Sequence, residues 1–113
     1  KKPVMAERLA SYESFWPFYL REHSRRTTRH LHFVGTAGGL AVTSRAIYRR
    51  EAKGLCLALV VGYGFAWISH AFVEKNRPAT FKYPLWSFIS DFRMLYRWLV
   101  GLLDEDLRRA GII

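Results

Sequence analysis

The most constraining feature of this 113-residue chain is a run of 20 residues, 54–73, that contains no Asp, Glu, Lys or Arg. As an α-helix, such a run is about 30 Å long, which matches the thickness of the hydrocarbon core of a bilayer. Trp67 and Phe72 lie near one end, where aromatic side chains suit the lipid–water interface. The alternative is the central helix of a soluble bundle, but a chain this short could hardly surround that helix on every side. The run therefore predicts a membrane-spanning helix.

A second uncharged stretch, residues 31–44, precedes this run and contains three glycines between positions 35 and 39. Small residues at that density favour close helix–helix approach in a membrane. The basic segment RAIYRREAKG, around Glu51, separates the two stretches and predicts a turn. We therefore expect an all-α fold: a small helical membrane protein of about four helices in one domain, 1–113, with a central transmembrane hairpin (about 30–49 and 54–75). The glycines equally permit a helix–helix dimer.

Amphipathic helices are expected on both sides of the hairpin. Residues 4 to about 22 repeat apolar side chains at steps of three and four, and Pro17 is expected to kink or restart this helix. The segment SRRTTR, 24–29, interrupts the apolar pattern and offers hydroxyl caps for a new helix. From Leu85 onward, a last helix mixes aromatic and basic residues, which predicts a helix lying along the interface or re-entering the bilayer.

The charge of the chain implies an anionic neighbour, because 18 Lys and Arg face 9 Asp and Glu for a formal net charge of +9. The basic residues bracket the apolar runs, which favours membrane lipids over nucleic acid as that neighbour. The larger basic sets, 21–29 and 75–82, predict cytoplasmic termini for an integral membrane protein of the bacterial inner membrane or the endoplasmic reticulum. The N-terminal residues lack the apolar core of a signal peptide. A single cysteine, Cys56, excludes a disulfide within the chain.

The histidines raise the question of a metal site. In a hairpin that turns at Glu51, His32 and His70 lie at the same depth, because one is 19 residues before the turn and the other 19 after it. Glu74 shares the helical face of His70. His23 reaches the same end only if the chain bends at SRRTTR, since nine residues of continuous helix would place it opposite His32.

His30 cannot join His32 on one ion from a regular helix, because their directions differ by about 200°. It is expected to support the site from outside, to ligate from non-helical backbone, or to lie at the interface. Three neutral imidazoles, with or without a carboxylate, suit Fe(II), Zn(II) or Cu(II). The competing interpretation is that each histidine is simply a hydrogen-bonded residue at a helix end.

Two motifs resemble the 2-hydroxy-fatty-acid dioxygenase family of α-oxidation, which comprises small helical membrane proteins long classed as a domain of unknown function. The first motif corresponds here to Tyr19, His23, Thr28, His32 and Gly35, and the second to His70, Glu74, Pro78 and Ala79 in SHAFVEKNRPA. The downstream TFKYPLWSFISDFRM is similar to the bacterial branch, and the resemblance spans about residues 15–98. Thr28 replaces the usual Asn and Ser69 the usual Gly.

The resemblance implies Fe(II)-dependent oxidation of a long-chain 2-hydroxy acid by O₂ to the fatty acid one carbon shorter, a step of lipid and sphingoid-base catabolism. It implies metal binding by His23, His32 and His70, with Glu74 a fourth ligand or, preferably, the partner that orients a histidine. Arg26, Arg29 and Arg77 are candidates to hold the acidic head of the substrate. The candidates for supporting roles around the metal are His30, Thr28 and Asp91, although Asp91 is equally expected to pair with Arg93 or another arginine.

Two other classes of function fit the same sequence. A non-enzymatic lipid-binding or structural membrane protein accounts for the charge, the aromatics and the hairpin without a metal. A haem-binding helical membrane protein would use histidines on facing helices. The sequence leaves open the chain length of the acid, whether it is free or a thioester, the source of reducing equivalents and the oligomeric state.

Overall fold

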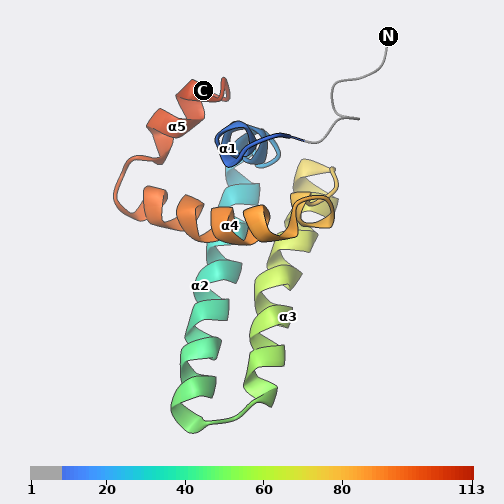
Figure 1. Cartoon of the computed structure of the whole chain (residues 1–113), viewed down its shortest axis with the longest axis vertical. Helices are drawn as coiled ribbons and strands as arrows, with labels where there is room; N and C mark the ends of the chain where they lie inside the picture. The colour runs from blue at the N-terminus through green and yellow to red at the C-terminus, as the bar shows by residue number, and fades with distance from the viewer. Residues whose placement is uncertain (1–8) are drawn as a thin grey trace.

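The computed structural model describes residues 9–113, and these residues are helical without a strand (Figure 1). The five α-helices are α1 (Tyr12–Arg21), α2 (Arg26–Arg49), α3 (Lys53–Ile68), α4 (Pro84–Leu99) and α5 (Leu103–Arg109). A π-helix, Ser69–Glu74, continues α3, and a short 3-10 turn, Ala79–Phe81, precedes α4.

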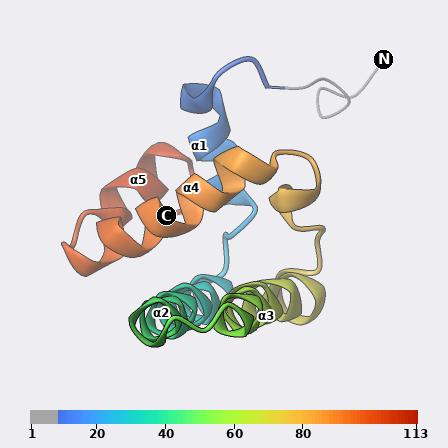
Figure 2. The same cartoon turned by 60° about the horizontal axis from the view of Figure 1, so that its bottom comes forward.

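The long α2 and α3 form the expected helical hairpin. α2 ends at Arg49, and the next residue, Arg50, takes a left-handed conformation with φ 56°, so the chain reverses around Glu51 as predicted. The helices pack closely because glycine lines their contact: a Cβ built on Gly35 would lie 2.9 Å from the carbonyl oxygen of Gly62. In Figure 2, α2 and α3 lie side by side as one layer, and α1, α4 and α5 form a second layer above it.

Only one of the two expected membrane spans has the length and composition to cross a bilayer. It is Lys53–Glu74, with 22 residues and a mean hydropathy of 1.7, and it is the sole such helix among the residues that the structure describes. α2 falls short because its uncharged part, 31–44, is only about 21 Å long and rich in Gly, Thr and Ser. The helical hairpin is thus confirmed, while the crossing of the membrane by both of its helices stays a prediction.

The second layer holds an aromatic core that fixes α1 against α4 and α5. Tyr12 donates or accepts a hydrogen bond with Ser90 at 2.8 Å, which ties the start of α1 to the middle of α4. The largest fully buried apolar side chains of this core are Phe15, Tyr19, Leu20, Met94 and Leu107. This core matters for the site because it holds the C-terminal end of α1 over the open end of the hairpin.

The flanking helices differ from the prediction in two ways. The described part of the first helix starts at Tyr12 and continues through Pro17 without a break, and the part expected over residues 4–8 lies outside the described residues. The expected last helix is two helices, α4 and α5, because Gly101 takes a φ of 80° and ends the helical path between them. The count is therefore five α-helices in the described chain, not about four.

Candidate metal centre

Three histidines from three different segments meet in the interior. His23 lies in the turn between α1 and α2, His32 on α2 and His70 in the π-helix, and all three are at least 96% buried. The Nε2 atom of His23 lies 3.0 Å from Nε2 of His32 and 3.1 Å from Nε2 of His70. The potential ligand atoms of all three lie within 4.8 Å of one another. The predicted bend at SRRTTR exists, because the helical path is interrupted between Arg21 and Arg26.

The outward-facing nitrogens of two of these rings are bonded to oxygens that can only accept. Nδ1 of His23 lies 2.7 Å from the carbonyl oxygen of Tyr19, and Nδ1 of His70 lies 2.6 Å from Oδ1 of Asn76. Each Nδ1 must therefore carry the proton and donate it. The Nε2 atoms of these two neutral rings consequently carry lone pairs, and both lone pairs face the shared centre.

His32 is held in the same way, with a weaker pair of acceptors. Its Nδ1 lies 3.3 Å from the carbonyl oxygen of Thr28 and 3.2 Å from the hydroxyl of Ser69. The Ser69 hydroxyl donates to the carbonyl of Ala66 at 2.7 Å, so it is free to accept from His32. The Nε2 atom of His32 is thus also left with its lone pair towards the other two rings.

This arrangement fits a metal ion better than a purely structural cluster. The lone pair of His23 faces those of His32 and His70 at about 3 Å, and such lone pairs repel when neither a proton nor a cation lies between them. Two nitrogens that are bound to one ion at about 2.1 Å and at a right angle lie about 3.0 Å apart. Burial, followed by the neighbouring His32 and His70, holds the pKa of His23 well below its usual value of 6.5, so His23 stays neutral and able to ligate. The three histidines could therefore bind a metal; the donor set alone does not distinguish Fe(II) from Zn(II) or Cu(II).

The π-helix, Ser69–Glu74, brings the side chains of His70 and Asn76 together in the interior. The backbone N–H of Asn76 donates to the carbonyl of His70 at 2.9 Å, and Lys75 takes a left-handed conformation with φ 61°. This closure brings the Asn76 side chain back onto the ring of His70. The Nδ2 group of Asn76 donates to the carbonyl of Glu22 at 3.1 Å, which joins the π-helix to the end of α1.

Glu74 lies at the start of α2 and not with the histidines. Its carboxylate accepts from the backbone N–H of Arg25 at 3.0 Å, from the hydroxyl of Thr28 at 2.7 Å and from the hydroxyl of Ser24. The cluster of possible ligands in the described chain contains only the three histidines. Of the two alternatives for Glu74, this geometry does not favour the fourth ligand, because both carboxylate oxygens serve the unpaired N–H and hydroxyl groups of a helix start. The hydrogen-bond partner of His70 is Asn76, and Glu74 instead bonds to Thr28 and Ser24 in the segments next to His32 and His23.

Asp91 returns to this end of the molecule, as expected, but pairs with a tyrosine. The hydroxyl of Tyr19 donates to its carboxylate, and the ring of Tyr19 lies 4.2 Å from the ring of His23. The predicted salt bridge to Arg93 is wrong: the Arg93 guanidinium lies over the ring of Trp16 at 4.2 Å, and the ion pairs between described residues are formed elsewhere. Burial raises the pKa of Asp91 to about 7.

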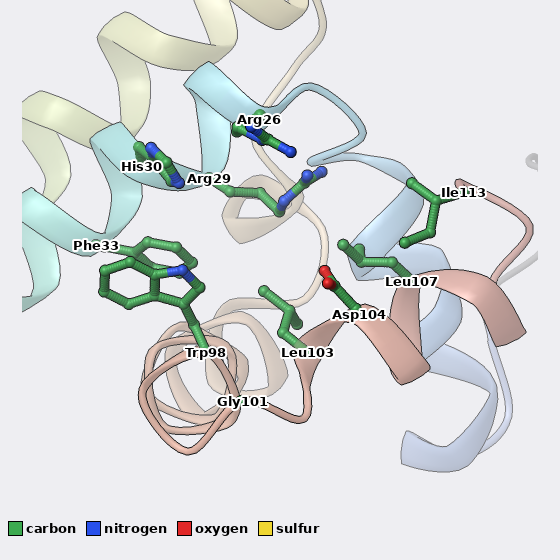
Figure 3. Close-up of a pocket in the computed structure, with 10 residues that line it drawn as sticks. All are labelled: Arg26, Arg29, His30, Phe33, Trp98, Gly101, Leu103, Asp104, Leu107 and Ile113. Carbon is green, nitrogen blue, oxygen red and sulfur yellow. The ribbon is translucent and has the colours of Figure 1, made fainter.

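His30 and two of the three candidate arginines line a different pocket. This pocket, of about 480 Å³, lies between the start of α2 and the α4–α5 junction, and Figure 3 shows Arg26, Arg29 and His30 around it with Asp104 opposite. Arg29 donates to the carbonyls of His23 and Ser24 at 2.9 and 2.8 Å, so it braces the turn that carries His23. His30 is exposed on α2 and contacts the ring of Trp98, which among the three alternatives for this residue favours a position at the interface over a role beside the metal.

Arg77 lies on the remaining side. Its guanidinium lies 4.9 Å from the centre of the Phe81 ring, in a surface recess that Trp67 and Pro78 also line. Trp67 and Pro78 also line the small cavity at the histidines, so the recess of Arg77 shares two lining residues with that cavity. The role of Arg77 towards a substrate stays a prediction.

Sequence reasoning missed two functional residues here and gave a third the wrong significance. Asn76 and Ser87 carried no signal, because the contact of Asn76 with His70 depends on the π-helix and the position of Ser87 beside the histidine cavity depends on how α4 crosses the hairpin. Ser69 was noted only as a departure from a family motif, yet its hydroxyl is a partner of His32. The one signal for this role of Ser69 is its position as a polar residue next to His70 in an otherwise apolar run.

Comparison with known proteins gives one match. A family model described as Mpo1-like, 2-hydroxy-palmitic acid dioxygenase Mpo1-like, matches residues 9–103. No curated protein and no solved structure matches the chain.

Proposed function

The chain belongs to the Mpo1-like family of 2-hydroxy-palmitic acid dioxygenases, and from that premise we propose that it is a non-haem Fe(II) dioxygenase of long-chain 2-hydroxy fatty acids. In this proposal His23, His32 and His70 hold the iron. The observation that carries it is the convergence of three buried Nε2 atoms with their Nδ1 protons tied to oxygen acceptors. When bound, Fe(II) supplies the redox chemistry that lets O₂ react with an organic acid.

The proposed reaction balances without an external reductant. The acid R–CH(OH)–COOH and one O₂ give R–COOH, CO₂ and H₂O. The bond between carbons 1 and 2 breaks, carbon 2 becomes the new carboxyl carbon, and the four electrons lost by the substrate reduce O₂ fully. Carboxylate and 2-hydroxyl together offer two oxygen donors on adjacent carbons, a pair suited to the open positions that three protein ligands leave.

The surroundings of the histidines support small-molecule chemistry and disfavour haem. The free space beside the three rings is about 10 Å³, room for about one water-sized polar group, so the histidines do not line a preformed haem pocket. Facing haem ligands also need the macrocycle between them, whereas the Nε2 atoms of His23 and His32 are only 3.0 Å apart. A haem-binding protein is therefore the poorer account of this geometry.

The membrane location expected for a fatty-acid enzyme is supported by the apolar Lys53–Glu74 segment. The histidines lie at the end of the hairpin away from its turn, which puts them near one surface of the bilayer if this segment crosses it. Cytoplasmic termini remain part of the proposal. An acyl chain dissolved in the adjacent leaflet would then reach the site laterally.

Turnover tests the proposal directly. Purified protein is loaded with Fe(II) without oxygen and then given 2-hydroxypalmitic acid and O₂. We expect the 15-carbon acid and CO₂ in equal amounts, with no product from His32→Ala. His30→Ala is the matched control, because His30 is exposed and lies outside the cluster. A folded, iron-loaded protein that binds the acid without oxidising it would support the lipid-binding alternative instead.

A further inference from the structure

An apolar groove runs along the hairpin beneath α4. It has a volume of about 460 Å³ and is formed by α2, α3 and α4. Its lining is largely aliphatic and aromatic and includes Gly39, Leu40, Ala58, Leu59, Gly62 and Phe92. On each hairpin helix it covers eight residue steps, 35–43 and 55–63, which correspond to about 12 Å of α-helix. A groove of this shape suits a single extended apolar chain better than a globular ligand.

The groove ends beside the histidines. Asp91 lines the groove and also lines the small cavity that contains His23, His32 and His70. Gly35, at the same end of the groove, is one helical turn from His32 on α2. The groove therefore borders the candidate metal centre, and Asp91 lies at the junction between the two spaces.

Ser87 provides a second, independent observation at this junction. It is 98% buried on α4 and lines the histidine cavity, and its hydroxyl is the one buried side-chain oxygen or nitrogen of the described chain without a hydrogen-bond partner. Leaving such a group unpaired costs free energy. A polar ligand in the cavity would remove that cost. The other buried serine on the same helix, Ser90, differs because its hydroxyl is already hydrogen-bonded to the hydroxyl of Tyr12.

We propose that the groove holds the acyl chain of the substrate and that the Ser87 hydroxyl contacts the carboxylate or 2-hydroxyl of its head beside the three histidines. This inference rests on the proposed function for the identity of the head group. The groove accommodates about ten carbon–carbon bonds at roughly 1.2 Å of advance per bond, the value for an extended chain. Longer chains extend past Thr43 and Leu55 towards the hairpin turn and into lipid.

Gly62 and Gly64 give a matched pair of variants for the groove. Gly62 lines it, and a Cβ there meets nothing nearer than the Gly35 carbonyl at 3.8 Å, so the side chain of Gly62→Leu starts without a clash and is expected to occupy the groove. Gly64 lies two residues on, about 200° around α3, and a Cβ there meets nothing within 4 Å. Gly64→Leu thus adds the same side chain to the same helix outside the groove.

Photo-crosslinking in lipid nanodiscs tests where the chain lies without relying on turnover. The probe is a 2-hydroxy fatty acid with a diazirine in mid-chain, used without oxygen on the full chain with and without Fe(II). We expect cross-links in 35–43 and 55–63, a fall of at least about tenfold in Gly62→Leu, and no change in Gly64→Leu. Cross-links elsewhere, or equal yields in all three proteins, as bulk lipid in the groove would give, would overturn the proposal.

The head contact is tested by Ser87→Ala beside Ser90→Ala. We expect Ser87→Ala to weaken probe binding about fivefold or more while leaving the melting temperature unchanged or higher, because no internal hydrogen bond is lost. Ser90→Ala should lower the melting temperature and leave probe affinity unchanged. Equal affinity of Ser87→Ala and wild type would refute the contact. Groove cross-links without turnover by the iron-loaded protein would count against the proposed function and not against the groove.

Discussion

At the scale of single residues, each ring of the histidine cluster depends on an oxygen acceptor from a different place. Equal distances from Glu51 predicted that His32 and His70 meet, and their ring centres lie 5.1 Å apart. The acceptors of His23 and His70 could not be predicted, because they are a backbone carbonyl and an amide whose position depends on the π-helix. Spacing along a helix specifies which side chains lie at the same depth. It does not specify which groups accept hydrogen bonds from the far side of each ring.

Asn76 gives the sharpest residue-scale prediction. Asn76→Ala removes the acceptor for Nδ1 of His70, so we expect metal affinity to fall about 10- to 100-fold with an unchanged helical spectrum. Asn76→Asp keeps an oxygen acceptor in the same place and should retain affinity. Titration of both variants with Fe(II) under nitrogen measures this. Equal affinities for wild type and Asn76→Ala would show that this hydrogen bond does not orient the ligand.

Asp91 predicts a pH-dependent difference in stability. Its pKa is about 7 in the fold and near 3.8 in the unfolded chain, so the folded protein holds a proton between these values that the unfolded chain has lost. The free energy of unfolding of the wild type therefore falls as the pH rises from about 4 to 7. Asp91→Asn lacks this pH dependence, because an amide does not titrate. We expect the melting temperature of the variant minus that of wild type to grow over this range. A constant difference would mean that the carboxyl titrates alike in both states.

At the scale of elements, the hairpin was largely predictable and its continuation was not. The predicted helices, 30–49 and 54–75, overlap α2 and the α3–π-helix segment almost throughout, because uncharged runs bounded by a basic turn specify where such helices begin and end. The π-helix and the α4–α5 break were missed. The π-helix is stabilised by contacts between Asn76, His70 and Glu22, which no local pattern records, and the break depends on Gly101 in a run read as one helix.

The close packing of α2 against α3 predicts that an alanine substitution is destabilising at Gly35 and not at Gly64. Gly35→Ala would place a methyl 2.9 Å from the Gly62 carbonyl and 3.0 Å from Cβ of Phe65, so the helices must separate, and we expect a loss of about 1–3 kcal/mol. Gly64→Ala meets nothing and should be neutral or stabilising by up to about 1 kcal/mol, since alanine favours helix. Thermal unfolding in detergent compares them. A Gly35→Ala variant as stable as wild type would contradict the packing.

At the scale of the whole molecule, the distal half of the hairpin presents apolar side chains that the rest of the fold does not cover. Val60 on α3 is 67% exposed and Ile47 on α2 is 67% exposed, whereas the aromatic core covers only the end with the histidines. In Figure 1, α4 crosses the hairpin near that end, and the turn projects away from the other helices. Such exposure is costly in water and favourable in lipid, which agrees with the charge distribution seen in the sequence.

A charge in the exposed apolar face tests the membrane interpretation. Arg at the centre of a spanning helix costs about 2.5–3.5 kcal/mol, so we expect Val60→Arg to shift the protein from the membrane fraction or to lower its yield there. Tyr48→Arg is the control, because Tyr48 is 89% exposed beside the basic turn and outside the apolar span. The assay is fractionation after alkaline washing. Unchanged membrane retention of Val60→Arg would contradict a span through this helix.

The central claim, that three buried histidines form a metal centre, is tested most directly by metal stoichiometry. Wild type, His32→Ala and His30→Ala are purified in detergent, loaded with Fe(II) without oxygen, freed of unbound metal and analysed for iron per chain, with circular dichroism to confirm folding. The account predicts about one iron per chain in wild type and His30→Ala and close to none in His32→Ala. A folded wild type that retains no iron, or a His32→Ala variant that retains as much, would contradict it.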